Sequence, residues 1–367
     1  MLHLPIDVLQ NFMVEVFTRI GVPKDDARIC SEILIASDLK GIESHGIGRL
    51  KMYYDRIKLG IQQPVTKIDV IQDRYATAVW DGNHGMGHVV AHKAMLEAIS
   101  KAGKYGLGAV AVRNSTHYGI CGYYSELATR HNMIGLVFTN ARPSICPTNG
   151  VDPLLGTNPI CFGAPTDLAY PFLYDAATSI SQRGKIEQLD REEKNTPEGW
   201  AIDREGNYCT NTPKLLKDLV SQTAALLPIG GMDELSGSHK GYGLATMVEI
   251  LCAALQDGSF TNALLGTDEL GKPCPYRLGH FFLAINIDFF IEIDRFRKIC
   301  GDICRDLQNS TLLPGRERIW VAGEKEYENE LRVREHGVPI VPNLLKNIKT
   351  MQQELGFEII DTAGLQA

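Results

Sequence analysis

Residues 106–111 read GLGAVA, which matches the G-x-G-x-x-A pattern found in Rossmann folds. In a Rossmann fold the pattern follows a strand and opens a helix. Here the order is inverted. A helix-type run, HVVAHKAMLEAISKA (88–102), precedes it, and a strand-type run, GAVAVRN (108–114), follows. The stretch therefore argues against a Rossmann fold and predicts a sheet connected in another way.

Further strand-type runs alternate with helical patterns from about residue 68 onward. They are TAVWDG (77–82), IGLVFTN (134–140), PICFGAP (159–165), PFLYDAA (171–177) and FFLAINIDFF (281–290). Another helical pattern is GYYSELATRHN (122–132), and GYGLATMVEILCAALQ (241–256) is apolar nearly all round, which predicts a buried helix. The polar stretch 183–213 indicates a surface excursion. The pattern predicts an α/β (α+β) fold in which helices cover apolar strands.

The N-terminal part of the chain is predicted to be wholly helical. One apolar face runs from Val8 to Ile20, a second helix follows Pro23 and ends at Gly41, and a third begins near Ile47. The last 70 or so residues, rich in Arg, Lys and Glu, are expected to form exposed helices and loops.

Composition narrows the class of protein. The 367 residues carry a formal net charge of −7, which argues against a nucleic-acid or anionic-membrane partner. No run of 18 apolar residues is present and the first residues lack a basic signal-peptide region, so we expect no membrane span and no secretion. Nine cysteines without a C-x-x-C pair indicate reduced thiols and a cytoplasmic protein.

The first candidate site lies in ESHGIGRL (43–50). If the third helix includes this segment, His45 and Arg49 share one helix face and Tyr53 extends it. An arginine can clamp a carboxylate bidentately, and a histidine can exchange a proton near neutral pH. Glycines at 46 and 48 weaken a helix but suit a close approach to the backbone. The alternative is a solvated arginine and a structural histidine at a frayed helix start.

The second candidate is His117 in AVRNSTHYGICGYYSELA (111–128), in a polar loop between a strand and a helix. First-turn amides of that helix can receive a phosphate. An ordinary polar turn is the alternative.

Three other features carry weaker signals. Asp175 ends the strand-type run PFLYDAA, where it could orient a histidine, accept from a ribose hydroxyl or cap a helix. His239 and Lys240 precede a glycine-spaced helix start that suits an anion, although a solvated lysine would give the same pattern. His84, His88 and His92 have helical zinc-binding spacing, but no acidic or cysteine ligand is interleaved, so we predict no metal site.

Together these stretches resemble the malate/L-lactate dehydrogenases of the second, non-Rossmann type. The segments that carry the resemblance are ESHGIGRL, NSTHYGICGYY, GTNPICFGAP, DAATSISQRGKIE, SHKGYGLATMVEIL, GHFFLAI, and AGEKE followed by HGVPI. The stretch TNARPSICPTNGVDPLLGTNP (139–159) looks closest to the malate dehydrogenase members.

The resemblance implies NAD(P)-dependent interconversion of a small 2-hydroxy acid and its 2-oxo acid in a homodimer. Malate and oxaloacetate are the first expectation; lactate, sulfolactate, ureidoglycolate or a diketo acid are alternatives, and a metal-dependent hydrolase or lyase is a more distant one. NAD is expected, with NADP as the alternative. The resemblance also implies a mainly helical domain built from both termini, 1–70 and 292–367, packed on a sheet-containing cofactor domain, 71–291.

Residue roles follow from the same resemblance. The implied catalytic residues are Ser44, His45, Arg49, His117 and Lys185. Those implied or proposed for substrate binding are Arg49, Tyr53, Arg142 and Thr157, Arg142 being our choice for a second carboxylate. The implied cofactor-binding residues are His117, Tyr118, Gly119, Ile120, Cys121, Asp175, Ala176, Ala177, His239, Lys240, Gly323, Glu324 and Lys325. Imine-reducing relatives carry an aspartate where Lys185 stands, which favours an oxygen substrate here. Whether His45 or His117 transfers the proton stays open.

Overall fold

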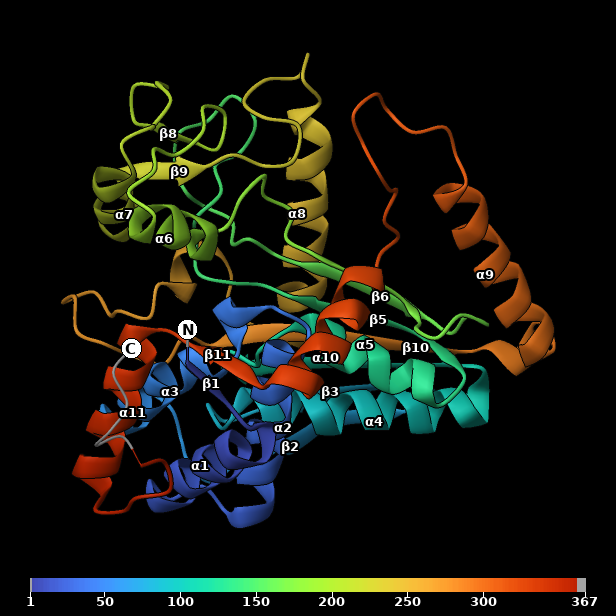
Figure 1. The fold of residues 1–367 in the computed structure, drawn as a ribbon, viewed down its shortest axis with the longest axis horizontal. Helices are drawn as coiled ribbons and strands as arrows, with labels where there is room; N and C mark the ends of the chain where they lie inside the picture. The colour runs from blue at the N-terminus through green and yellow to red at the C-terminus, as the bar shows by residue number, and fades with distance from the viewer. Residues whose placement is uncertain (1, 362–367) are drawn as a thin grey trace.

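A computed structural model describes residues 2–361 and has a mixed seven-stranded sheet at its centre (Figure 1). The strand order is β2-β3-β4-β10-β5-β6-β7. The strands are β2 (Asp69–Arg74), β3 (Thr77–Asp81), β4 (Leu107–Ser115), β5 (Met133–Thr139), β6 (Ile160–Ala164), β7 (Phe172–Ala176) and β10 (Leu278–Asn286). Only the β3–β4 pairing is parallel among these neighbours. The α/β fold and its six predicted strand-type runs are confirmed.

Helices cover both faces of this sheet. Helices α4 (Gly87–Tyr105) and α5 (Cys121–Arg130) lie on one face, and α8 (Ser238–Ala253) lies on the other (Figure 1). The glycines of GLGAVA serve this packing: Gly106 ends α4 with φ +83°, and a Cβ on Gly108 would lie 2.0 Å from the Ala98 carbonyl oxygen of α4. Gly106 therefore ends helix α4, and Gly108 lets strand β4 pack closely against that helix. Neither glycine lies in a phosphate-binding loop of the Rossmann type, as the inverted order of the elements predicted.

A mainly helical unit forms beside the sheet from both ends of the chain. It contains α1 (Ile6–Arg19), α2 (Lys24–Leu39), α3 (Leu50–Lys58), α10 (Glu324–His336) and α11 (Pro342–Leu355), which share one apolar core. The unit is not wholly helical, because β1 (Leu2–Leu4) pairs antiparallel with β11 (Val338–Ile340). Residue 1 and residues 362–367 of the unit expected from the sequence lie outside the described residues.

Helix α9 (Ile293–Gln308) falls inside the range 292–367 that we assigned to the helical unit, yet it contacts the sheet. Arg305 forms a two-pronged ion pair with Asp167 in the turn between β6 and β7. Figure 1 shows α9 on the opposite side of the molecule from α1 and α11. The exact domain boundaries therefore remain a prediction.

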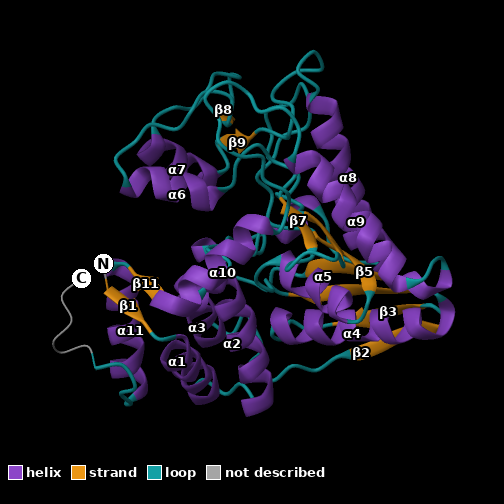
Figure 2. Cartoon of the chain, turned by 45° about the vertical axis from the view of Figure 1, so that its right-hand side comes forward, coloured by secondary structure: helices purple, strands orange, loops and turns teal. Residues whose placement is uncertain are grey.

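Residues 183–226 form a small lobe of their own (Figure 2). It contains α6 (Arg183–Arg191), β8 (Ala201–Asp203), α7 (Thr212–Ser221) and β9 (Ala224–Leu226). The predicted surface excursion 183–213 is part of this lobe, and its Ile186 packs with Leu215 and Leu226, which follow it in the chain, in one apolar cluster. Short 3₁₀ turns complete the chain at Glu43–His45, Ile47–Arg49, Ala254–Gln256, Thr261–Leu264 and Ile287–Phe289.

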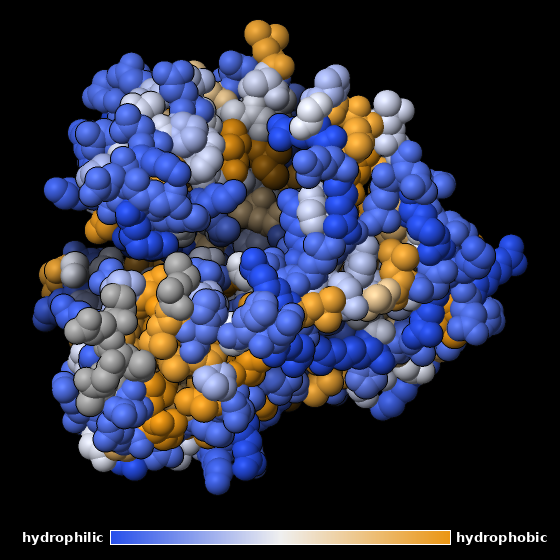
Figure 3. Space-filling model, in the orientation of Figure 1, coloured by the Kyte–Doolittle hydropathy of each residue, from blue (hydrophilic) through white to orange (hydrophobic). Residues whose placement is uncertain are grey.

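Helix α8 forms as predicted, but the prediction that it is buried all round was wrong. Its Val248 and Cys252 side chains pack against the sheet, whereas Leu244, Met247 and Ile250 are exposed, Ile250 by 57%. Figure 3 shows apolar side chains on the surface in the region of α8 and α9. A uniformly apolar helix thus has a second apolar face without a cover within this chain.

Among residues 2–361, no helix combines the length and the apolarity needed to cross a bilayer.

Candidate active site

The segment ESHGIGRL does not lie in one helix. It forms two 3₁₀ turns, Glu43–His45 and Ile47–Arg49, and α3 begins only at Leu50. The prediction that His45 and Arg49 share an α-helical face was therefore wrong. Instead, Arg49 Nε reaches back and donates to the Ser44 carbonyl oxygen at 2.5 Å, which ties the two turns together.

Asp38 of α2 explains why the helix is interrupted. Its carboxyl accepts from the backbone amide of Ile47 at 2.8 Å, and a Cβ on Gly46 would lie only 1.8 Å from its Oδ1 atom. The expected close approach to the backbone is thus made at Gly46, by a buried side chain. Burial raises the Asp38 pKa to about 8, the Ile47 amide opposes this rise, and Glu43 adds to it.

His45 and His117 come together from distant parts of the chain. Their rings are stacked, with centroids 5.5 Å apart and planes 23° apart. Ser44 Oγ lies 2.9 Å from His45 Nδ1, and Tyr53 Oη lies 2.5 Å from His117 Nδ1. Each imidazole therefore has one ring nitrogen engaged by a hydroxyl group.

Both imidazoles are neutral at physiological pH. Burial, assisted by Arg49, lowers the pKa of His45 to about 4. Burial also lowers the pKa of His117 well below its ordinary value, with further contributions from His45, Arg56 and Arg49. A neutral imidazole can accept a proton from a hydroxyl group, which a permanently charged one cannot do.

The two histidines line a cavity of about 170 Å³ between the helical unit and the sheet. This volume is below the roughly 300–1,000 Å³ of pockets that enclose a whole drug-sized ligand, so it suits a small acid beside one end of a larger molecule. The predicted site residues that line it are His45, His117, Tyr118, Gly119, Ile120, Cys121, Thr157, Asp175 and Ala177.

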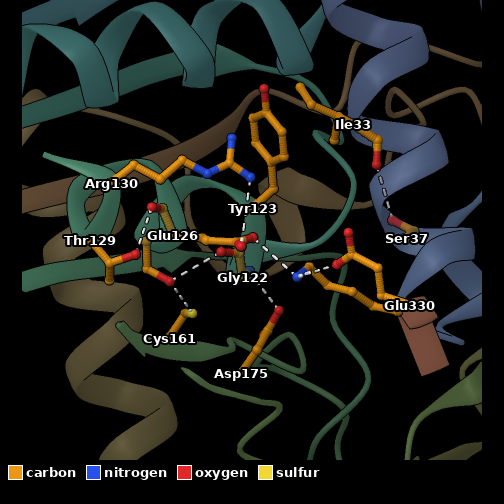
Figure 4. A network of polar contacts seen from close by, with 12 residues as sticks. Ile33, Ser37, Gly122, Tyr123, Glu126, Thr129, Arg130, Cys161, Asp175 and Glu330 are labelled. Carbon is orange, nitrogen blue, oxygen red and sulfur yellow. Dashed lines mark hydrogen bonds and ion pairs between the residues drawn. The ribbon is translucent and has the colours of Figure 1, made fainter. Parts of the chain in front are cut away.

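Asp175 lines the cavity and caps α5 through Gly122 (Figure 4). Its Oδ2 atom accepts from the Gly122 amide at 2.7 Å, in the first turn of a helix that has no capping side chain of its own at Ile120. Desolvation raises the Asp175 pKa to about 6, the Gly122 amide opposes this, and Glu326 adds to it. Of the three roles considered for Asp175, helix capping is therefore the one for which the structure shows a partner, the Gly122 amide.

Several lining residues had not been anticipated. They are Lys40, Ile42, Gly122, Thr139, Asn140, Ala141, Pro159, Leu173, Gln182, Leu278 and Glu326. Lys40 is buried and forms ion pairs with Glu126 of α5, at 3.1 Å, and Glu330 of α10, at 3.9 Å. Thr139 is the last residue of β5 and Asn140 follows it, while Asp175 is the last but one residue of β7. The position near a strand end that singled out Asp175 could therefore have identified Thr139 and Asn140 as well. Nothing local in the sequence distinguishes Lys40 or Glu326.

Other predicted residues lie close to the cavity without lining it. Ser44 forms a hydrogen bond with His45, and Tyr53 forms one with His117, so each is one contact away from the cavity. Arg49 in turn donates to the Ser44 carbonyl oxygen. Lys185 is exposed on α6, one residue after Gly184, where a Cβ would lie 3.2 Å from Ser44 Cβ. Ala176 follows Asp175 in β7.

The remaining predicted residues have other surroundings. Arg142 donates to the Val220 carbonyl oxygen at 3.3 Å, in the small lobe. His239 and Lys240 are exposed in the first turn of α8. At the start of α10, Gly323 packs against β7, Glu324 is buried and accepts from the Val321 amide, and Lys325 lies against the Trp320 ring; the next residue, Glu326, lines the cavity.

The three histidines with zinc-binding spacing do not share a helix face. His84 has φ +57° in the turn before α4, whereas His88 and His92 lie within α4. His88 is fully buried with its pKa lowered to about 3 by desolvation, and it packs edge-on against Tyr53 at 4.7 Å. Within residues 2–361 we find no cluster of metal-ligating side chains.

Comparison with known proteins adds independent evidence. The family model for malate/L-lactate dehydrogenase matches residues 4–349. A malate dehydrogenase of Pyrococcus horikoshii is 41% identical over 97% of this chain and 96% of its own length. An L-sulfolactate dehydrogenase of Methanocaldococcus jannaschii is 38% identical over 96% of this chain and 97% of its own.

A solved structure gives the same result at the level of the fold. The crystal structure of malate dehydrogenase from Entamoeba histolytica superimposes with a TM-score of 0.94 at 43% identity, covering 97% of this chain and 99% of that chain. The chain belongs to the malate/L-lactate dehydrogenase family and is an enzyme of that dehydrogenase type.

Proposed function

We propose that this enzyme interconverts malate and oxaloacetate with NAD. The observation that carries the proposal is the stacked pair of neutral imidazoles, His45 and His117, on one cavity. Relatives described as malate dehydrogenases, at 41% and 43% identity, support malate over the other 2-hydroxy acids. Sulfolactate, lactate, ureidoglycolate and diketo acids remain the alternatives within the same chemistry, and a sulfolactate relative at 38% identity favours the first of these.

His45 is the proposed proton acceptor. Its Nδ1 atom can donate to Ser44 Oγ, which leaves Nε2 with a free lone pair. Because its pKa is lowered to about 4, the ring is uncharged when a hydroxy acid arrives. The 2-hydroxyl proton would pass to this atom during oxidation and return from it during reduction.

Arg49 is the proposed clamp for the 1-carboxylate. Its Nε atom is held by the Ser44 carbonyl, while neither terminal nitrogen has a hydrogen-bond partner among the described residues. Such a guanidinium can make a two-pronged contact with a carboxylate. Thr157 lines the cavity and keeps its proposed substrate role, whereas Tyr53 reaches the cavity only through His117. The proposed roles of Arg142 and Lys185, which do not line the cavity, stay predictions.

The nicotinamide cofactor fits the cavity chemically. Asp175 already holds the Gly122 amide at the start of α5, and His117 accepts from the Gly119 amide, so the neighbouring backbone amides of the 118–121 loop are the ones suited to polar ligand atoms. We propose that this loop, Asp175 to Ala177, His239, Lys240 and the start of α10 hold the dinucleotide. When bound, the nicotinamide ring supplies the acceptor for the hydride of C2.

Lys240, which we place at the dinucleotide, is an exposed cation, and the choice of NAD over NADP rests on the charges that line the cavity itself. Asp175 and Glu326 line it, and the one lysine there, Lys40, is already paired with Glu126. We see no unpaired cation in the lining of this cavity that would attract an additional phosphate.

A homodimer is proposed from the apolar surface of α8 and α9. Leu244, Met247 and Ile250 on α8, and Ile299 and Ile303 on α9, are exposed at helical spacing. Exposed apolar helix faces can mark a protein interface, and a second copy of the chain is the proposed occupant. All nine cysteines are free thiols, which supports the proposed cytoplasmic location.

The test is a spectrophotometric assay of reduced nicotinamide against a panel of 2-oxo acids, with both cofactors and with a chelator. We expect the highest kcat/KM for oxaloacetate with NADH, unchanged by chelation. Faster turnover of sulfopyruvate or pyruvate would replace the substrate, and no turnover of any 2-oxo acid would refute the function.

A further inference from the structure

Two donors converge on one nitrogen of His117. Tyr53 Oη lies 2.5 Å from His117 Nδ1, and the Gly119 backbone amide donates to the same atom at 3.4 Å. A backbone amide can only donate, so Nδ1 must be the acceptor and the proton of the neutral ring must sit on Nε2. The tautomer thus follows from the pattern of hydrogen bonds around the ring.

Tyr53 is suited to hold this arrangement. It is fully buried, and its hydroxyl has no other hydrogen-bond partner among residues 2–361. The edge-on contact with His88 and the neighbouring Phe17 ring fix the phenol in place. Burial raises the Tyr53 pKa far above its ordinary value, so the hydroxyl keeps its proton at every working pH and donates it to His117.

We propose that Tyr53 is a positioning residue that locks His117 in the Nε2–H tautomer, so that His117 presents a hydrogen-bond donor to the cavity while His45 presents the acceptor. His117 lines the cavity, and its Nδ1 is taken, which leaves Nε2 for the ligand. His45 differs because Ser44 Oγ, the only hydrogen-bond partner of its ring among residues 2–361, can accept as well as donate. The inference rests on the proposed function and gives its two histidines different roles, His117 as hydrogen-bond donor and His45 as proton acceptor.

The division has a direct chemical consequence. The C2 oxygen of the hydroxy acid would receive a hydrogen bond from His117 Nε2–H while its own proton moves to His45 Nε2. In the same step the O–H electron pair forms the C2=O double bond, and the C2–H bond breaks with its electron pair passing as hydride to the nicotinamide ring of the proposed function. In the reverse reaction protonated His45 returns the proton, and His117 stabilises the negative charge that develops on the oxygen.

The experiment combines ¹⁵N-histidine NMR of the full-length protein with kinetics of Tyr53→Phe. In the wild type we expect His117 Nε2 to carry the proton and Nδ1 to be unprotonated at pH 7, with the signal assigned by its loss in His117→Asn. Tyr53→Phe should populate both tautomers and lower kcat at least about 10-fold, with a smaller change in KM; in a serine protease a wrong histidine tautomer costs roughly 10⁴-fold.

Tyr54→Phe is the matched control. Tyr54 is the next residue of α3, equally buried, and its hydroxyl donates to Glu354 at 2.5 Å. This variant should leave the His117 tautomer and kcat unchanged. A wild-type His117 protonated on Nδ1, or a Tyr53→Phe enzyme with wild-type tautomer and kcat, would overturn the proposal. The NMR result stands even if Tyr53→Phe fails to fold, and it is independent of whether malate is the substrate.

Discussion

The Asp38 carboxyl occupies the space that a Cβ on Gly46 would need, 1.8 Å from the ideal position of that atom. Because Asp38 also holds the Ile47 amide, this one contact fixes the double turn that carries Ser44 and His45. The position of the proposed proton acceptor therefore depends on a glycine that contacts no ligand.

Gly46→Ala should destabilise the protein and impair catalysis. The added methyl group must displace a short, buried side chain, and overpacking of this kind costs about 1–3 kcal/mol. Thermal unfolding and kcat measure the two effects. Gly48→Ala is the control, because its Cβ would meet the Glu43 carbonyl oxygen at an ordinary 3.4 Å. Equal losses in the two variants would contradict this account.

Asp38→Asn should change the pH dependence of stability. The folded-state pKa of about 8 lies above the ordinary value of 3.8, so the folded protein keeps a proton that the unfolded chain loses. That contribution to stability is complete below pH 4 and declines as the pH rises to 8. Asparagine cannot ionise, so the Tm of the variant relative to the wild type should rise between pH 4 and 8 and then level off. Parallel Tm curves would show that Asp38 is not protonated in the fold.

Arg49→Lys should lower kcat/KM for malate by several kcal/mol of transition-state stabilisation, because a point charge replaces a planar fork. Steady-state kinetics measures this loss. Arg28→Lys is the comparison, since Arg28 is an exposed residue of α2 that pairs with Asp25 and lies outside the cavity lining. Near-normal kcat/KM in Arg49→Lys would rule out the carboxylate clamp.

His45→Asn and His117→Asn should differ in their pH profiles. With a pKa of about 4, wild-type His45 is neutral from pH 6 to 8, so kcat/KM for malate oxidation should be flat there and fall below pH 5. His45→Asn should lower kcat/KM roughly 10²–10⁴-fold and abolish its decline below pH 5. His117→Asn keeps a side-chain amide that can donate a hydrogen bond. It should therefore retain the decline of kcat/KM below pH 5 and should be more active than His45→Asn. The reverse ranking would make His117 the base.

Ile250→Asp on α8 should weaken self-association, because it places a charge in the exposed apolar face. Sedimentation velocity over a concentration series would follow the change. Leu235→Asp is the matched control, since Leu235 is completely exposed in the loop before α8. A wild type that is monomeric throughout, or a variant that associates equally well, would exclude this face as the interface.

The sequence predicted most of the architecture because the strands are strongly apolar and well separated. The inverted glycine pattern was decisive, since Gly106 and Gly108 proved to serve a helix end and a helix–strand contact. The small lobe was missed because Ile186 lies in a polar segment, and because its partners Leu215 and Leu226 lie beyond that segment, in α7 and β9.

The site was harder to predict than the fold. His45, His117 and Asp175 could be found because each stands in a recognisable local pattern. Their mutual geometry depends on Asp38, whose carboxyl prevents a helix across 43–49, and on Tyr53, whose partner is 64 residues away. Lys40 and Glu326 are brought to the cavity by packing alone, which no local pattern encodes.

The pairing of Leu2–Leu4 with Val338–Ile340 has a consequence for synthesis on the ribosome. The first helices cannot complete their core until α11 has emerged, whereas the strands from β2 to β10 already have their partners. Folding should therefore start in the middle of the chain, and the segment with His45, although translated early, would reach its working position among the last.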